Sequence, residues 1–152
     1  MHDFWPSSGY RLMGRTPDDR LYVMYARANL LYYADMESSS PYAWSTMMQA
    51  VPQAEAQLRR VLRSDADRPT WVVVWQPATS FGLDRSGETR RLLARHYRRA
   101  AVICGKSVLI RKDDARRLAR PAAQQCPRLE VPDGLGPDAS RSPADSAEFI
   151  WQ

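Results

Sequence analysis

The stretch TWVVVWQ, residues 70–76, decides the fold of this 152-residue chain. Its β-branched and aromatic side chains follow one another without polar alternation, which is typical of a strand that is buried on both faces. Strands of this kind belong to α/β proteins, in which helices cover both faces of a largely parallel sheet. The sequence on either side of the strand is therefore expected to supply those helices.

The sequence before this strand, VPQAEAQLRRVLR at residues 51–63, has the period of an amphipathic helix. Pro52 suits the first turn of that helix, where a missing backbone N–H leaves no hydrogen bond unmade. One helical face carries the apolar side chains Val51, Ala54, Leu58, Val61 and Leu62. The following residues, SDADRP, end the helix ahead of the strand.

The sequence after the strand, FGLDRSGET at residues 81–89, contains two glycines with the spacing of a phosphate-binding Walker A loop, Gly82 and Gly87. That motif requires a lysine directly after the second glycine, because its ammonium group neutralises the phosphates. Glu88 stands there instead, and its carboxylate repels phosphate. The stretch is better explained as a helix start, with Ser86 as the N-cap and Glu88 in the first turn.

The remaining elements are predicted from shorter patterns. Residues 21–25, LYVMY, form a first strand, and residues 26–35, ARANLLYYAD, form a short helix that ends at ESSSPY. The helix after Ser86 runs through residues 90–96, and its buried side carries Leu92, Leu93, His96 and Tyr97. Two strands follow, AAVIC at 100–104 and SVLIR at 107–111, joined by a two-residue hairpin turn at Gly105-Lys106.

This order of elements predicts an α/β fold: a small, mostly parallel sheet covered by helices, with a C-terminal antiparallel β-hairpin. Residues 1–16 are expected to be an irregular lead-in and residues 17–113 the α/β domain. Residues 114–152 are expected to begin with a short helix at DDARRLAR and to continue as a mostly disordered tail. No apolar run reaches the roughly 18 residues of a membrane span, and no signal peptide opens the chain, so the sequence predicts a soluble protein or a soluble piece of a larger one.

Positive charge is concentrated in one part of the chain, residues 85–120, which hold 12 basic and 3 acidic residues. The candidate basic face comprises Arg90, Arg91, Arg95, Arg98 and Arg99. Such a surface can contact anionic lipid, nucleic acid or a phosphorylated carrier, and it can also be a merely solvated arginine-rich face. Nucleic acid is the weaker choice, because no aromatic residues alternate with the arginines to stack on bases.

Catalytic and metal-binding patterns are missing from the sequence. Cys104 and Cys126 lack metal-ligand spacing; Cys104 is expected to be buried and free, although a Cys104–Cys126 bridge stays open. His96 is expected to be structural, at the end of its helix. The acidic pairs 18–19 and 113–114 are expected to be solvated stop signals beside strands. We therefore predict no catalytic residue, no metal and no cofactor.

A ligand of an open α/β sheet binds beyond the carboxyl ends of the parallel strands. The segments that follow the two predicted parallel strands hold the candidate ligand-binding residues Arg27, Asn29, Gln76 and Phe81. An anion or a sugar phosphate is the hypothesis for this edge. The alternative is a loop that only closes the fold.

Three stretches of residues 17–112 resemble a known family: PDDRLYVMYARANLLYYADMESSSPYAW, DRPTWVVVWQP and LLARHYRRAAVICGKSVLIRK. Their order and texture are similar to the extracytoplasmic C-terminal domain of actinobacterial polytopic GT-C-type membrane glycosyltransferases. The resemblance implies that catalysis on a lipid-linked sugar belongs to a membrane-embedded half outside this sequence. It implies a noncatalytic accessory domain at the extracytoplasmic face, assisting the binding of acceptor glycan, lipid or partner.

Two other classes of function stay open. One is a free-standing cytoplasmic binding or regulatory module that uses the arginine-rich face on protein or nucleic acid. The other is a small independent enzyme, which is the weakest of the three because no acid, base and nucleophile can be assembled.

Overall fold

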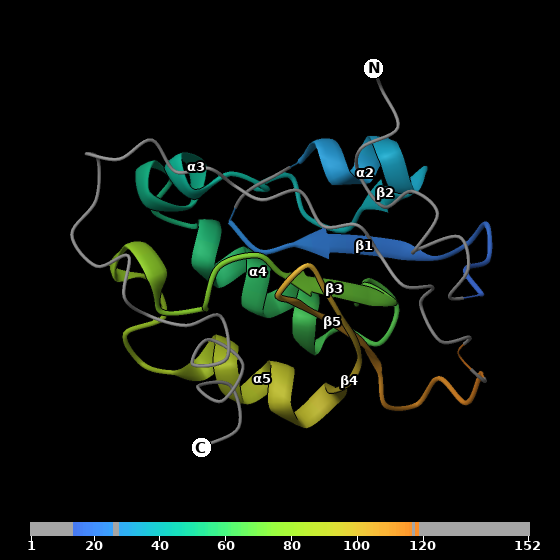
Figure 1. The fold of residues 1–152 in the computed structure, drawn as a ribbon. Helices are drawn as coiled ribbons and strands as arrows, with labels where there is room; N and C mark the ends of the chain where they lie inside the picture. Colours follow the sequence, from blue (N-terminus) through green and yellow to red (C-terminus); the bar gives the residue numbers. More distant parts are fainter. Residues whose placement is uncertain (1–13, 26–27, 117, 119–152) are drawn as a thin grey trace.

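The computed structural model describes residues 14–25, 28–116 and 118, which form a five-stranded sheet flanked by helices (Figure 1). The strands lie in the order β2-β1-β3-β5-β4. Their bounds are β1 (Arg20–Val23), β2 (Glu37–Ser38), β3 (Trp71–Val74), β4 (Tyr97–Ile103) and β5 (Lys106–Arg111). The helices are α2 (Asn29–Ala34), α3 (Ser45–Ala50), α4 (Ala54–Arg63) and α5 (Glu88–His96), and a 3-10 turn, η1 (Ser80–Gly82), precedes α5.

The sheet is parallel at one end and antiparallel at the other. β1 pairs in parallel with both β2 and β3, and Leu21 lies opposite Trp71. β5 then pairs antiparallel with both β3 and β4. The predicted α/β fold with a C-terminal antiparallel hairpin is confirmed.

β3 is buried on both faces, as its unbroken apolar sequence predicts. Val72 and Val74 belong to one core cluster, which α3, α4 and α5 complete with Met48, Leu58 and Leu93 among others. Trp71 and Val73 belong to a second cluster on the opposite face, to which α2 contributes Leu30 and Ala34. The alternation of a strand thus divides one apolar run between two cores.

Two elements were not predicted, α3 and β2. α3 has six residues and buries only Met48, and β2 has two residues that are both exposed, so neither leaves a periodic apolar pattern. The predicted helix at 51–63 begins at Ala54, because Val51 has extended backbone angles (φ −98°, ψ 109°) and ends α3.

Tyr97 lies in β4 and not on the buried side of a helix. Its backbone is extended (φ −123°, ψ 154°), and its buried hydroxyl donates a hydrogen bond to the carbonyl oxygen of Pro69 at 2.7 Å. The side chain is four residues after Leu93, so it fits the helical period as well as the strand. This ambiguity displaced the predicted start of β4 from residue 97 to residue 100.

The β4–β5 turn is Cys104-Gly105, one residue earlier than predicted. Both residues have positive φ, 49° and 72°, and Ile103 pairs with Lys106 across the turn. A two-residue turn with positive φ at both positions matches the twist of a hairpin. Cys104 is half-buried and disulfide-bonded, so the prediction of a buried free thiol is wrong; the only other cysteine of the sequence is Cys126.

Residues 1–13 of the lead-in predicted at 1–16, and the whole of the disordered tail predicted at 121–152, lie outside the described residues. The described residues after Asp113, which are 114–116 and 118, are not helical, so the predicted helix does not begin there. Across the described ranges, no helix has both the length and the apolar character that a bilayer crossing needs.

Candidate functional site

The carboxyl ends of β1 and β3 lie at one edge of the sheet, because these neighbouring strands are parallel. α4 leads into the amino end of β3 and α5 follows β3, so both helices begin at this same edge. A groove of about 530 Å³ lies there between the end of α3, the first turns of α4 and the segment 81–86. Its polar side chains are Gln49, Glu55, Arg59, Arg85 and Ser86, and its aromatic side chain is Phe81.

Phe81 is the predicted ligand residue that lines this groove. Its side chain is 49% exposed, and its backbone has the left-handed angles φ 61°, ψ 22°. The amide of Gln49 donates a hydrogen bond to the carbonyl oxygen of Phe81 at 3.1 Å. A bulky residue in this conformation is uncommon, so surrounding contacts must hold it there.

The carboxylates around the groove all have partners. Glu55 Oε2 accepts a hydrogen bond from Arg59 Nη1 at 3.1 Å and another from the backbone N–H of Asp84 at 3.2 Å. Glu88 forms ion pairs with Arg59, at 3.4 Å, and with Arg63. Both carboxylates are already engaged by guanidinium groups, so this arrangement suits binding better than proton transfer.

Asp84 explains why the sequence 81–89 does not form a phosphate loop. Its buried carboxylate accepts the backbone N–H of Thr89 at 2.8 Å and that of Arg90 at 3.1 Å. These amides point out of the α5 N-terminus, where a bound phosphate would find its donors. The carboxylate of the chain itself takes the place of an anionic ligand.

Ser86 contributes less to the start of α5 than predicted. The N-cap position belongs to Gly87, with φ 68°, and the Ser86 hydroxyl lies 3.4 Å from the N–H of Glu88. Glu88 does lie in the first helical turn. The capping role of Asp84 was missed, because its side chain reaches amides five and six residues ahead.

The other predicted ligand residues are not brought into this groove. Arg27 lies outside the described residues, and the structure describes the backbone of Asn29, at the start of α2, but not its side chain. Gln76 is half-buried and is not among the residues that line the groove. An enclosed space of about 20 Å³ beside Ala78 has room for one water molecule at most.

A second groove, of about 510 Å³, lies near the amino end of β1. Its charged side chains are Asp18, Asp19, Arg20, Asp35 and Glu37. Asp35 forms an ion pair with Arg15 at 2.8 Å. In the part of the chain that the structure describes, no three His, Cys, Asp or Glu side chains are grouped so that they could hold a metal ion.

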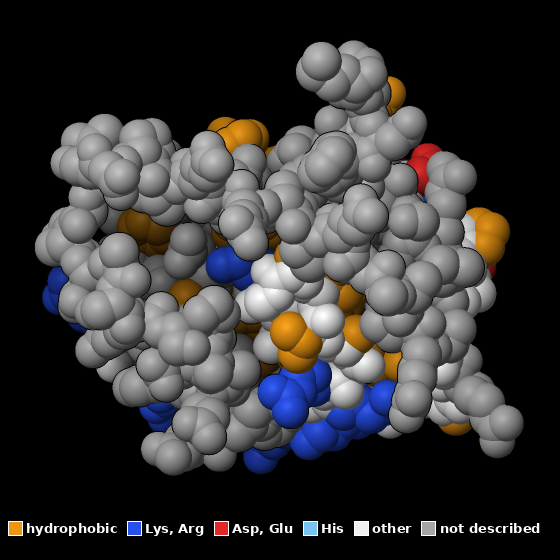
Figure 2. All heavy atoms as spheres, viewed as in Figure 1, with side chains coloured by type: hydrophobic (Ala, Val, Ile, Leu, Met, Phe, Trp, Pro, Cys, Tyr) orange, Lys and Arg blue, Asp and Glu red, His pale blue; other side chains and the backbone are white. Residues whose placement is uncertain are grey.

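The five arginines of the predicted basic face do not all share one surface. Arg91 and Arg95 are exposed and lie one turn apart on α5, and Figure 2 shows Lys and Arg side chains gathered along the edge where α5 and β4 lie. In β4, Arg99 alternates onto the side of Tyr97, which packs with α5, whereas Arg98 reaches the carbonyl oxygen of Asp114 at 3.4 Å. Arg90 is half-buried.

The cationic edge, which we define as Arg91, Arg95 and Arg99, has no ion-pair partner among the described carboxylates. Nearby, burial together with the charges of Arg68 and Arg95 lowers the pKa of His96, so this imidazole is neutral at pH 7. Its charge therefore adds little to the edge.

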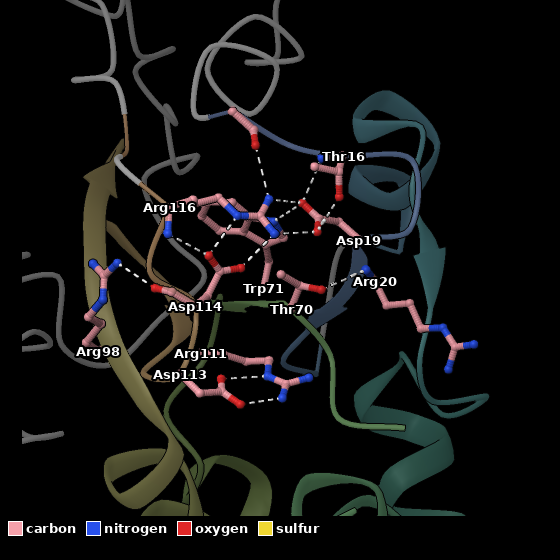
Figure 3. A network of polar contacts seen from close by, with 11 residues as sticks. Thr16, Asp19, Arg20, Thr70, Trp71, Arg98, Arg111, Asp113, Asp114 and Arg116 are labelled. Atoms are coloured by element: carbon pink, nitrogen blue, oxygen red, sulfur yellow. Dashed lines mark hydrogen bonds and ion pairs between the residues drawn. The ribbon is translucent and has the colours of Figure 1, made fainter. Parts of the chain in front are cut away.

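A polar network joins the beginning and the end of the described domain (Figure 3). Asp19 is only 5% exposed. Its carboxylate accepts hydrogen bonds from Arg116 Nη1 at 2.7 Å, from Arg116 Nη2 at 2.9 Å and from the indole N–H of Trp71 at 2.8 Å. Arg116 also forms an ion pair with Asp114 at 2.6 Å. Burial by itself raises the pKa of Asp19, but the hydrogen bonds from Arg116 and Trp71 outweigh it and lower the pKa.

The prediction that residues 18–19 are solvated stop signals is therefore wrong for Asp19, which is a buried structural acid. Asp113, in the other acidic pair, is exposed and bonded to Arg111 at 2.5 Å, and this hydrogen bond lowers its pKa.

The described fold is a small mixed α/β domain with one ligand-sized groove at the carboxyl edge of its parallel strands. Comparisons with protein-family models, with curated proteins and with solved structures found no match. The groove and the cationic edge are the two surfaces of the described residues that are suited to binding.

Proposed function

We propose that this chain is a noncatalytic accessory domain of a membrane glycosyltransferase-like protein, in which it assists the binding of acceptor glycan, lipid or a partner. The observation that carries the proposal is that the carboxylates around the groove of about 530 Å³, which we call the carboxyl-edge groove, are all hydrogen-bonded or ion-paired within the chain. Glu55, Asp84 and Glu88 are each bound by arginines or backbone amides, so the groove offers a binding surface without a free acid or base.

The cationic edge supports a membrane setting for this domain. Its three guanidinium groups form no ion pair with a carboxylate of the described residues. Each Lys or Arg near an anionic lipid surface contributes about 1 kcal/mol to membrane binding. The resemblance that the order and texture of residues 17–112 suggest implies a membrane setting, in which such a surface would face the lipid. The proposed partners are the membrane-embedded half of a parent protein and anionic lipid.

The disulfide at Cys104 supports the extracytoplasmic side of the membrane. Disulfides persist in oxidising compartments and are rare in the cytosol. Cys104 lies in the β4–β5 turn and carries such a bond. This is the expected chemistry for an extracytoplasmic domain.

The test is sedimentation of the chain with phosphatidylglycerol vesicles and with phosphatidylcholine vesicles, at low and at physiological salt. We expect binding to the anionic vesicles alone, weakened by salt. Arg91→Glu/Arg95→Glu should abolish it. Arg20→Glu/Arg60→Glu is the matched control, because it makes the same change of charge on exposed side chains of β1 and α4.

Equal losses in both double variants would mean that binding follows net charge and not the cationic edge. Absence of vesicle binding would contradict the membrane role. The alternative function is a cytoplasmic module that binds nucleic acid or protein through the same arginines. Binding to single-stranded RNA that is tighter than vesicle binding and is lost in Arg91→Glu/Arg95→Glu would favour it.

A further inference from the structure

We propose that the carboxyl-edge groove is a saccharide subsite that takes a sugar ring bearing a carboxylate. This inference rests on the proposed accessory function and deepens it, because it names the site and the chemical class of its ligand. The groove offers an aromatic side chain, two polar side chains and one arginine that forms no ion pair with a described carboxylate.

Phe81 is the platform. Phe81 is half exposed and lines the groove, and an aromatic face is electron-rich, so it attracts the polarised C–H groups on one face of a sugar ring. The backbone at Phe81 is held in its left-handed conformation by the hydrogen bond from Gln49 to its carbonyl oxygen, which fixes the point from which the side chain projects. A backbone that is fixed before binding need not be ordered by the ligand, so its conformational entropy is not lost on binding.

Gln49 and Ser86 supply hydrogen bonds to hydroxyl groups. The Gln49 amide has two N–H donors and a carbonyl acceptor, and its contact with Phe81 uses one donor. The Ser86 hydroxyl accepts the N–H of Glu88, which leaves its own O–H group as a donor. Both side chains are exposed and line the groove.

Arg85 carries the positive charge that selects an anion. Arg59, the other cation of the groove, is neutralised by Glu55 and Glu88. Arg85 donates only its Nε–H, to the carbonyl oxygen of Gly82 at 3.2 Å, and forms no ion pair with a described carboxylate. Its remaining N–H groups match a carboxylate, which a guanidinium can bind through two parallel hydrogen bonds.

A single carboxylate fits this site better than phosphate. The backbone amides at the start of α5, which would bind a phosphate, are occupied by the carboxylate of Asp84. Of the two arginines that line the groove, Arg59 is paired with carboxylates and Arg85 is not, so the groove compensates a single negative charge better than a double one. The groove therefore accepts one negative charge on a polyhydroxylated ring and disfavours nucleotides.

The experiment is a saturation-transfer and chemical-shift titration of the full chain with a glucuronic acid disaccharide, a neutral glucose disaccharide and AMP. We expect the acidic disaccharide to bind about tenfold more tightly than the neutral one. Arg85→Gln should remove this preference. Phe81→Ala should weaken the binding of both disaccharides about tenfold, and Phe81→Trp, which keeps an aromatic face, should bind them about as tightly as the wild-type protein.

The controls separate this proposal from the proposed function. Tyr32→Ala, at an aromatic side chain that is 84% exposed on α2, should leave sugar binding unchanged. Thermal unfolding of each variant shows whether it is folded, and Phe81→Ala should retain vesicle binding. Vesicle binding without sugar binding would overturn the saccharide subsite alone. Preferential binding of AMP would show a nucleotide site and would also overturn it.

Discussion

At the scale of single residues, Asp84 decides what the start of α5 can bind. A helix N-terminus attracts anions through its unpaired backbone amides and its dipole. In this domain an internal carboxylate already accepts the amides of Thr89 and Arg90. The chain thus resembles a phosphate loop in its glycine spacing and at the same time carries a built-in competitor for phosphate.

Replacing Asp84 with Ala should therefore have two effects. Loss of the cap should lower the free energy of unfolding by about 1–2 kcal/mol, measured by urea denaturation. Inorganic phosphate at high concentration should then stabilise the variant and not the wild-type protein, because the freed amides can donate hydrogen bonds to it. Asp18→Ala, at an exposed neighbour of β1, is the control and should change neither quantity.

A loss of stability in Asp84→Ala that phosphate does not reverse would show that Asp84 caps α5 but that the helix N-terminus does not bind anions. Stability equal to that of wild type would contradict the capping role itself.

At the scale of elements, the β4–β5 hairpin depends on two consecutive residues with positive φ. Glycine reaches this region without steric cost, whereas Cys104 adopts it at φ 49°. The turn is short, and its register is fixed by the pair Ile103 and Lys106. Strain in the turn therefore acts directly on the pairing of both strands.

Gly105→Ala should lower the free energy of unfolding by about 1 kcal/mol, because a side chain is disfavoured at φ 72°. Gly105→Asn should recover part of this loss, since asparagine tolerates left-handed backbone. Thermal and urea unfolding measure both variants. A turn formed by Gly105 and Lys106, as the sequence predicted, would leave Asn without an advantage over Ala.

The elements differ in how well their sequences predict them. β3 and α4 have apolar patterns long enough to distinguish a buried strand from an amphipathic helix. α3 and β2 are too short to show a period, and Tyr97 satisfies two periods at once. Phe81 was found as a candidate because it follows β3, whereas Gln49 joins the groove from 32 residues earlier in the chain, a contact that no local motif signals.

At the scale of the whole molecule, Asp19 and Arg116 join segments that are 97 residues apart. The pair is buried on the aspartate side, and the Arg116 guanidinium also lies 5.9 Å from the centre of the Trp71 ring. The pair links the irregular segment that precedes β1 and the irregular segment that follows β5 to the sheet, through the contact of Asp19 with Trp71 in β3. Its loss should loosen both ends of the domain together.

Asp19→Asn should lower the free energy of unfolding by about 3 kcal/mol at pH 7, because it leaves Arg116 without its main partner. The folded-state pKa of Asp19 lies below its unfolded value of about 3.9. The stabilisation is therefore complete above roughly pH 4 and is lost as the pH falls through the folded-state pKa. Urea midpoints from pH 7 to pH 2 should converge for the two proteins at the acidic end, and a constant difference across this range would contradict the role of this ionisation.

The contact between Arg116 and Gly14 has a consequence for protein engineering. Arg116 Nη1 donates a hydrogen bond to the carbonyl oxygen of Gly14 at 3.0 Å, so the two ends of the described domain are within one side-chain length of each other. A few glycine and serine residues could join them, and new ends could be opened in the exposed turn at 65–67 between α4 and β3 without cutting a strand. The domain is thus suited to circular permutation and to grafting into a surface loop of a host protein.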